Sequence, residues 1–161
     1  MFSDNVAIFL LITHGIVAVF TLGALTHQVI SLTWAPKGAG QAGFVTSLRA
    51  VRAAHYTNAI IVLYVITAIL GGLIYVNYRI EVRQFYLDQY KMYKSNGLFE
   101  MKEHLIAMGL GLLPAYWYYW KQELKPEIAK VRTVLSAYLA FAVWFSFLVG
   151  HWLNNIQGFG K

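Results

Sequence analysis

The dominant feature of this sequence is four apolar stretches, each about as long as a membrane is thick. They cover about residues 5–33, 52–78, 99–120 and 131–153. A helix crosses the hydrocarbon core of a bilayer with about 20 residues. In lipid, every backbone N–H and C=O group must be bonded within the protein, which favours helices over irregular chain. The sequence therefore predicts an all-α integral membrane protein, a four-helix transmembrane bundle that forms a single domain over residues 1–161.

The charge content supports lipid as the main surrounding of the chain. Only 12% of the residues are charged and 58% are hydrophobic, whereas a soluble domain carries about 25% charged residues. The net charge of +6 comes from Lys and Arg near the ends of the apolar stretches, a distribution typical of membrane topology signals. We therefore expect the bilayer, and no nucleic acid, as a partner. The first stretch, at roughly 28 residues, exceeds the 7–15 of a signal-peptide core and is expected to be retained.

The connections between the stretches indicate an orientation. Residues 79–97 mix tyrosines with charged side chains, a pattern that predicts a short amphipathic helix at the headgroups between the second and third spans. The short loops at the end opposite the N-terminus are denser in Lys and Arg. The excess of Lys and Arg in cytoplasmic loops then predicts a bacterial inner (cytoplasmic) membrane protein with both termini outside the cytoplasm.

All five histidines lie within or at the edge of a predicted span. They are His14, His27, His55, His104 and His151. The chain has no cysteine, so histidine is the remaining strong ligand for a soft metal. An ionisable residue inside a membrane segment is by default a functional-site hypothesis. The five histidines are therefore the candidate ligands of a metal or of a metal-containing cofactor.

The histidines fall into two groups when their depths are compared. At about 1.5 Å per residue, His27 and His55 lie roughly 12–15 Å from the midplane on one side. On the other side, His14 and His104 lie about 8 Å from it and His151 about 12 Å. Two haems stacked across a bilayer each take two imidazoles from facing helices. The depths favour pairing His27 with His55, and His14 with His104 or His151.

The first span carries one histidine of each group, and their spacing constrains the pairing. Thirteen residues separate His14 from His27 by about 20 Å and rotate their side chains apart by roughly 140°. We therefore expect His27 to face the second span and His14 to face the third or fourth. Gly23, on the same face as His27, leaves room for a flat macrocycle. Arg52 and Arg79, near the headgroups, are candidate partners for haem propionates, although arginines at helix ends are also ordinary topology markers.

Other interpretations of the same residues stay open. His55 and His151, near helix ends, also fit interfacial side chains that reach water. His104 follows a polar helix start, and Glu100, one turn earlier, is placed to fix its tautomer. A metal site made of Glu100, His104 and His151 ranks lower, because the spacing matches no diagnostic pattern. Glycines at 71, 72, 109 and 111 are typical of close helix contacts.

The four spans with histidines at matched depths resemble the membrane b-type cytochromes, such as the cytochrome b561-like and CopD-like four-helix proteins. His14, His27, His55, His104 and His151 carry the resemblance. It implies one or two haem b groups bound through these histidines, and electron transfer between quinone or quinol and a partner redox protein. It also implies a subunit of a larger respiratory-type complex, more than a stand-alone enzyme.

Two alternatives come from different functional classes. In the first, the chain is a structural subunit of a larger membrane complex without redox activity, and its histidines are packed or interfacial. In the second, it binds pigment, with histidine ligating the magnesium of chlorophyll. A transporter or proton channel is disfavoured because no Asp, Glu, Lys or Arg lies near the midplane of a predicted span. A hydrolase is disfavoured because the chain has no Gly-x-Ser-x-Gly and no His-Glu-x-x-His motif.

Overall fold

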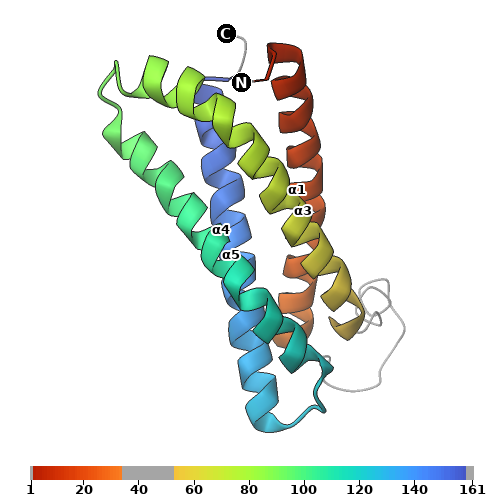
Figure 1. The fold of residues 1–161 in the computed structure, drawn as a ribbon. Helices are drawn as coiled ribbons and strands as arrows, with labels where there is room; N and C mark the ends of the chain where they lie inside the picture. Colours follow the sequence, from red (N-terminus) through yellow and green to blue (C-terminus); the bar gives the residue numbers. More distant parts are fainter. Residues whose placement is uncertain (1, 34–52, 159–161) are drawn as a thin grey trace, which may run out of the picture.

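Four long helices form an antiparallel bundle in the computed structural model, which describes residues 2–33 and 53–158. The described residues contain helices and turns and no strand. The elements are α1 (Asp4–Thr33), η1 (Ala53–His55), α3 (Tyr56–Asn77), η2 (Tyr78–Leu87), α4 (Tyr93–Lys121) and α5 (Pro126–Ile156). Successive helices run in opposite directions, so the start of α1 and the end of α5 lie at the same end of the bundle (Figure 1). This architecture confirms the predicted all-α four-helix bundle.

The helices close a ring around a shared interior. α1 packs against α3 and α5, and α4 packs against α5 and, less extensively, α3. The start of α1 is held at the far end of α3 by the buried amide of Asn77. Its Oδ1 accepts a hydrogen bond from the Phe2 backbone N–H at 3.0 Å, and its Nδ2 donates one to the Phe2 carbonyl at 3.0 Å. These bonds fix the lengthwise position of α1 against α3.

Three helical segments are long and apolar enough to cross a membrane: Asp4–Leu32, Tyr56–Leu87 and Pro126–Ile156. Large apolar side chains such as Phe9 and Phe141 are exposed on the outside of the bundle, where a soluble protein would carry polar groups. The outer surface therefore suits contact with a lipid bilayer.

α4 is of similar length, 29 residues, but it is more polar than the other three long helices. Its first half carries Lys94, Glu100, Lys102 and Glu103, and its last turns are rich in Tyr and Trp. That α4 also crosses the membrane therefore stays a prediction, which its place in the ring of helices supports.

The connection between the second and third helices differs from the prediction. A separate amphipathic helix was expected there, but α3 continues without a break as the π-helix η2 to Leu87 (Figure 1). Tyr78, Val82 and Leu87 are buried in a cluster with side chains of α4 and α5. These apolar contacts within the protein hold η2 on the bundle, so both neighbouring helices are longer than the sequence predicted.

A buried hydrogen-bond network joins three helices in the half of the bundle away from the start of α1. Gln28 on α1 accepts hydrogen bonds at its Oε1 from the Tyr116 hydroxyl at 2.7 Å and from the Ser136 hydroxyl at 3.1 Å. The Trp120 indole N–H donates to Ser136 Oγ at 3.3 Å. Gln28, Tyr116 and Ser136 are fully buried. Because these side chains are buried away from solvent, the network fixes the register of α1 against α4 and α5.

Replacing Gln28 by leucine is expected to lower the free energy of unfolding by about 1–2 kcal/mol. The substitution leaves the hydroxyls of Tyr116 and Ser136 without their acceptor, so two interhelical hydrogen bonds are lost. Each such bond in a membrane protein contributes about 0.6 kcal/mol on average, with a maximum near 1.7 kcal/mol. Unfolding in mild detergent, followed by circular dichroism, measures the change. Gln84→Leu, at an exposed position of η2, is the control, and equal stabilities of the two variants would contradict the prediction.

Candidate functional site

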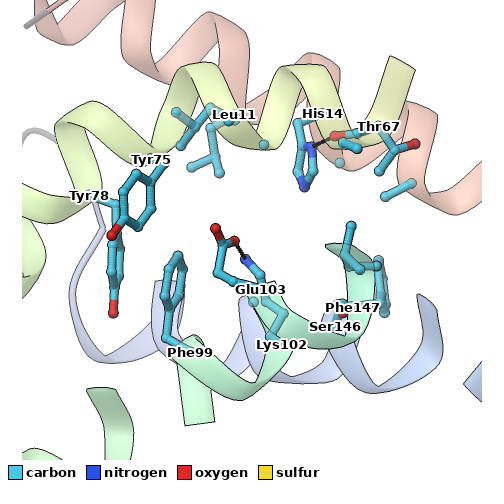
Figure 2. A pocket seen from close by; sticks show the side chains of 18 of the residues that line it. Leu11, His14, Thr67, Tyr75, Tyr78, Phe99, Lys102, Glu103, Ser146 and Phe147 are labelled. Atoms are coloured by element: carbon cyan, nitrogen blue, oxygen red, sulfur yellow. Dashed lines mark hydrogen bonds and ion pairs between the residues drawn. The ribbon is translucent and has the colours of Figure 1, made fainter. Parts of the chain in front are cut away.

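A cavity of about 520 Å³ occupies the half of the bundle that contains the start of α1 and the end of α5 (Figure 2). All four long helices and η2 line it, mostly with apolar side chains. Four glycines also line it, namely Gly15, Gly71, Gly72 and Gly150. Cavities that bind small molecules and cofactors have volumes of about 300–1,000 Å³, mostly apolar walls and a few polar groups. The cavity therefore has the size and character of a ligand site.

His14 supplies a polar group on the α1 wall of the cavity. Its Nδ1 lies 3.0 Å from the backbone carbonyl of Thr67, and since a carbonyl only accepts, Nδ1 carries the proton. The Nε2 atom, with a free lone pair, then points into the cavity (Figure 2). Histidines that bind metals commonly donate their other ring N–H to a carbonyl in this manner. His14 is therefore in the tautomer that a metal ligand requires.

The contact between His14 and α3 corrects one expectation. We expected His14 to face the third or fourth span, but its ring is bonded to the second, α3. The reason is Gly71 on α3. A Cβ atom at this position would lie 3.2 Å from His14 Cε1, so only glycine leaves the ring its full space. The tip of the ring still faces the cavity, whose far wall comes from α4 and α5.

Lys102 and Glu103 form an ion pair on the α4 wall, across the cavity from His14 (Figure 2). Lys102 Nζ lies 3.6 Å from Glu103 Oε1 and 4.2 Å from the centroid of the Phe99 ring. The Lys102 side chain is 16% exposed and that of Glu103 is 40% exposed. A charge away from water is costly unless it is paired, and charged side chains inside membrane bundles mark functional positions.

Sequence reasoning did not identify this pair, because it took residues 100–104 as a polar helix start. A signal was present nevertheless. Residues 99, 102, 103, 106 and 110 recur at the spacing of one helix face, and all five line the cavity. The charged pair shares this helix face with apolar residues. Because the apolar residues of a bundle helix face its interior, the pattern indicates that the two charges also lie on the inner side of α4.

Two buried hydroxyl groups at the cavity have no hydrogen-bond partner within the described part of the chain. They are Tyr78 Oη and Ser146 Oγ. Tyr78 is 6% exposed, and its ring stacks on Phe99 with centroids 3.6 Å apart. Buried hydroxyls are nearly always bonded in folded proteins. Both groups are therefore available to a molecule in the cavity.

The structure separates the two candidate partners of His14. His151 lines the same cavity from α5, its ring stacked on Phe147 at 6.5 Å between centroids. Both histidines are exposed, but His104 does not line the cavity, and its Nδ1 lies 2.7 Å from the Glu100 carbonyl of its own helix. The pairing of His14 with His151 is the one that the cavity supports, and ligation itself stays a prediction.

The expected role of the Glu100 side chain is not found. Its backbone carbonyl, and not its carboxylate, contacts His104. The carboxylate pairs instead with Arg83, at 3.3 Å. Over residues 2–33 and 53–158, no group of three or more His, Asp or Glu side chains is close enough to hold a metal ion. The lower-ranked site of Glu100, His104 and His151 is therefore not formed, whereas ligation of haem iron needs only two histidines.

The second pair of histidines lies at the other end of the bundle. The His27 ring is half-buried, with its centroid 4.9 Å from that of Tyr56, and its Nδ1 lies 3.4 Å from Ser31 Oγ. His55 immediately precedes Tyr56 and is exposed. The two histidines thus come to the same end of α1 and α3, as their depths predicted, and their ligation stays a prediction. Gly23 is exposed, and a Cβ there would meet open space.

The two arginines proposed for propionates have different outcomes. Arg52 lies outside the described residues. Arg79 is exposed, and its guanidinium donates a hydrogen bond at 3.3 Å to the hydroxyl of Tyr75, which lines the cavity. Arg79 therefore reaches the cavity through Tyr75 and is not itself a lining residue.

Comparisons of the chain with protein-family models, with curated proteins and with solved structures found no match. The cavity and its residues are therefore the features from which a function can be inferred.

Proposed function

We propose that this protein is a haem b-binding transmembrane electron-transfer subunit of a respiratory-type membrane complex. It passes electrons between quinone or quinol and a partner redox protein. The observation that carries the proposal is His14, whose Nδ1 is bonded to the Thr67 carbonyl while its Nε2 faces an apolar cavity of about 520 Å³. This combination of a fixed tautomer, a free ring nitrogen and cofactor-sized space is what axial ligation of a haem requires.

The residues around His14 fit a flat, mostly apolar macrocycle. Gly71, Gly72 and Gly150 keep the walls free of side chains, and His151 brings a second imidazole from α5. A haem bound here would supply one-electron chemistry at its iron. His14 and His151 would hold it through its iron. The chain's own share of the work is to fix the ring of His14 through Thr67 and to keep water away from the cavity with apolar side chains, both of which tune a redox potential.

The remaining parts of the proposal extend the same picture. His27 with His55 is the candidate ligand pair for a second haem at the opposite end of α1. The protein would lie in a bacterial inner membrane with both termini outside the cytoplasm, as its Lys and Arg distribution favours. Its partners would be other subunits of the complex, as an electron-transfer subunit requires.

Replacing His14 by alanine is expected to remove one equivalent of haem from the purified protein. A reduced-minus-oxidised spectrum in mild detergent, with a pyridine haemochrome count, measures the loss. His104→Ala is the matched control, because His104 is exposed and bonded only to its own helix. We expect the control to keep the haem content of the unchanged chain.

Three outcomes would contradict the proposal. Folded protein without a haem band would favour the structural-subunit interpretation. A band in the red that disappears in His14→Ala would favour pigment binding. Equal haem loss in the His14 and His104 variants would move the site away from the cavity.

A further inference from the structure

We propose that the cavity opens sideways into the lipid between α3 and α4, and that a quinol binds at this opening. Gly72, Ala107 and Leu110 line the cavity there and are also exposed on the outside of the bundle. The identity of the ligand as a quinol rests on the proposed function. The opening itself follows from the packing of the helices, whichever cofactor the cavity holds.

The cavity is a slot between two pairs of helices. α1 packs most extensively against α3, and α4 against α5, and the cavity lies between these two pairs (Figure 2). Along one side of the slot α3 faces α4, and these two helices pack together less extensively than either pair. Gly72 has no side chain, and a Cβ atom at its position would meet nothing within 4 Å. Side chains therefore leave this side of the slot open at Gly72.

The opening lies at the depth of the hydrocarbon. Gly72 is at the middle of the apolar segment Tyr56–Leu87, and Ala107 is at the middle of α4. The middle of a spanning helix lies near the centre of the bilayer, where a polar molecule is costly to place. The opening therefore admits molecules that dissolve in lipid and excludes water-soluble ones. A quinol, which joins an aromatic ring to an apolar tail, has the required solubility.

A hydrogen-bond acceptor for the quinol is present at the opening. Pro114 lies four residues after Leu110 in α4 and has no backbone N–H, so the Leu110 carbonyl lacks its usual donor within the helix. Leu110 is 37% exposed, and a backbone carbonyl without a partner is costly in lipid. A quinol hydroxyl would donate to this carbonyl, whereas a methyl ether in its place has no proton to donate.

His14 lies directly behind the opening. Its ring contacts Gly71, the neighbour of Gly72, since a Cβ atom at position 71 would lie 3.2 Å from His14 Cε1. The tip of the ring faces the same cavity (Figure 2). A quinol at the opening would therefore lie close to the side chain that the proposed function assigns to the haem iron.

Photolabelling with an azido-quinone tests the opening. The purified protein is labelled in lipid nanodiscs, and mass spectrometry maps the labelled peptides, which we expect to come from α3 and α4 around residues 72, 107 and 110. Gly72→Phe is expected to reduce this labelling roughly 10-fold or more, because its ring would fill the opening. Ala107→Phe, which covers the opening from α4, is expected to act in the same way.

Gly111→Phe is the matched control for these variants. Gly111 is exposed on α4, a Cβ atom there would meet nothing within 4 Å, and the residue does not line the cavity. The control is expected to be labelled like the unchanged chain. Circular dichroism and thermal unfolding identify any variant that has lost its fold.

Displacement of the label tests the contact with the Leu110 carbonyl. Decylubiquinol, kept reduced without oxygen, is expected to displace the label at a concentration roughly 2- to 10-fold lower than its dimethyl ether, the range of one neutral hydrogen bond. Pro114→Ala supplies the missing N–H and favours the helix, so it is expected to keep the fold and to reduce this preference. A preference that stays the same in Pro114→Ala would exclude the carbonyl as the partner of the hydroxyl.

The haem content of the same samples separates this inference from the proposed function. If the unchanged chain binds no haem but is labelled in a way that Gly72→Phe blocks, the proposed function fails and the opening stands. If the chain binds haem and both phenylalanine variants at the opening are labelled as strongly as the unchanged chain, the haem function stands and the opening is overturned. Haem binding together with labelling that depends on Gly72 supports both.

Discussion

Replacing Gly109 by alanine is expected to destabilise the bundle by about 1–3 kcal/mol, the usual cost of overpacking a filled interior. Gly109 is buried on α4, and a methyl group there would overlap the hydroxyl of Tyr64 and lie 3.3 Å from Leu139 Cδ2. Tyr64 is 1% exposed, and its hydroxyl donates a hydrogen bond at 3.2 Å to the Ile106 carbonyl. A shift of the ring into the cavity that it lines would break this bond and reduce the ligand space.

Thermal or denaturant unfolding in mild detergent measures the effect of Gly109→Ala. Gly111→Ala, on the same helix, is the control, because a Cβ atom there meets nothing within 4 Å. Alanine is the better helix former by about 1 kcal/mol, so this control is expected to be neutral or stabilising. Tyr64→Leu should relieve the overlap, so its combination with Gly109→Ala should cost less than the sum of the single changes. Additive effects would contradict the proposed contact.

Arg132→Ala is expected to lower the free energy of unfolding by about 3 kcal/mol, as the loss of hydrogen bonds from a charged group predicts. The last carbonyls of a helix have no donor within the helix, and α4 ends at Lys121. Arg132, on α5 and 7% exposed, supplies these donors. It donates to the carbonyls of Tyr119 at 2.8 Å, Trp120 at 3.5 Å and Gln122. Its positive charge also suits the negative end of the α4 dipole.

The planar guanidinium matters as well as its charge. Arg132 Cζ lies 5.1 Å from the centroid of the Trp120 ring, and one guanidinium reaches three carbonyls, which a lysine cannot reproduce. Arg132→Lys is therefore expected to recover only part of the loss. Lys130→Ala, at an exposed position two residues earlier, should change stability by less than about 0.5 kcal/mol. Equal effects of Lys130→Ala and Arg132→Ala in thermal unfolding would contradict this role.

The sequence predicted the four long helices correctly, but it predicted their ends less accurately. The first predicted span, 5–33, agrees with Asp4–Thr33, because hydropathy changes sharply at both of its ends. The second and third were predicted too short, since residues 79–97 carry many charges. The structure shows why charge alone misled the prediction. Tyr78, Val82 and Leu87 recur on one face of η2 and are buried there. The charged residues of η2 face outward or form pairs with other side chains.

The candidate site was predictable in its residue types and not in its assembly. His14 and His151 were expected at similar depth, and both line one cavity. His104, expected at the same depth, points away from it. Depth follows from the rise per residue, whereas the direction of a side chain depends on helix rotation and crossing. The pair Lys102 and Glu103 was missed for the same reason. A charged side chain near the end of a span can face either the interior of the bundle or the outside, and its depth does not decide between them.

By itself the sequence determined that this protein belongs in a membrane as a helical bundle, and that its five histidines lie within or at the edge of the apolar stretches. Hydropathy and composition decide these properties, because they depend on what each segment is made of and not on its neighbours. Only the tertiary structure decided which groups meet. Gly71 admits the ring of His14, Thr67 fixes its tautomer, and the packing of four helices forms the cavity that its Nε2 faces. These contacts join residues far apart in the chain, and helix crossing and side-chain volume set them.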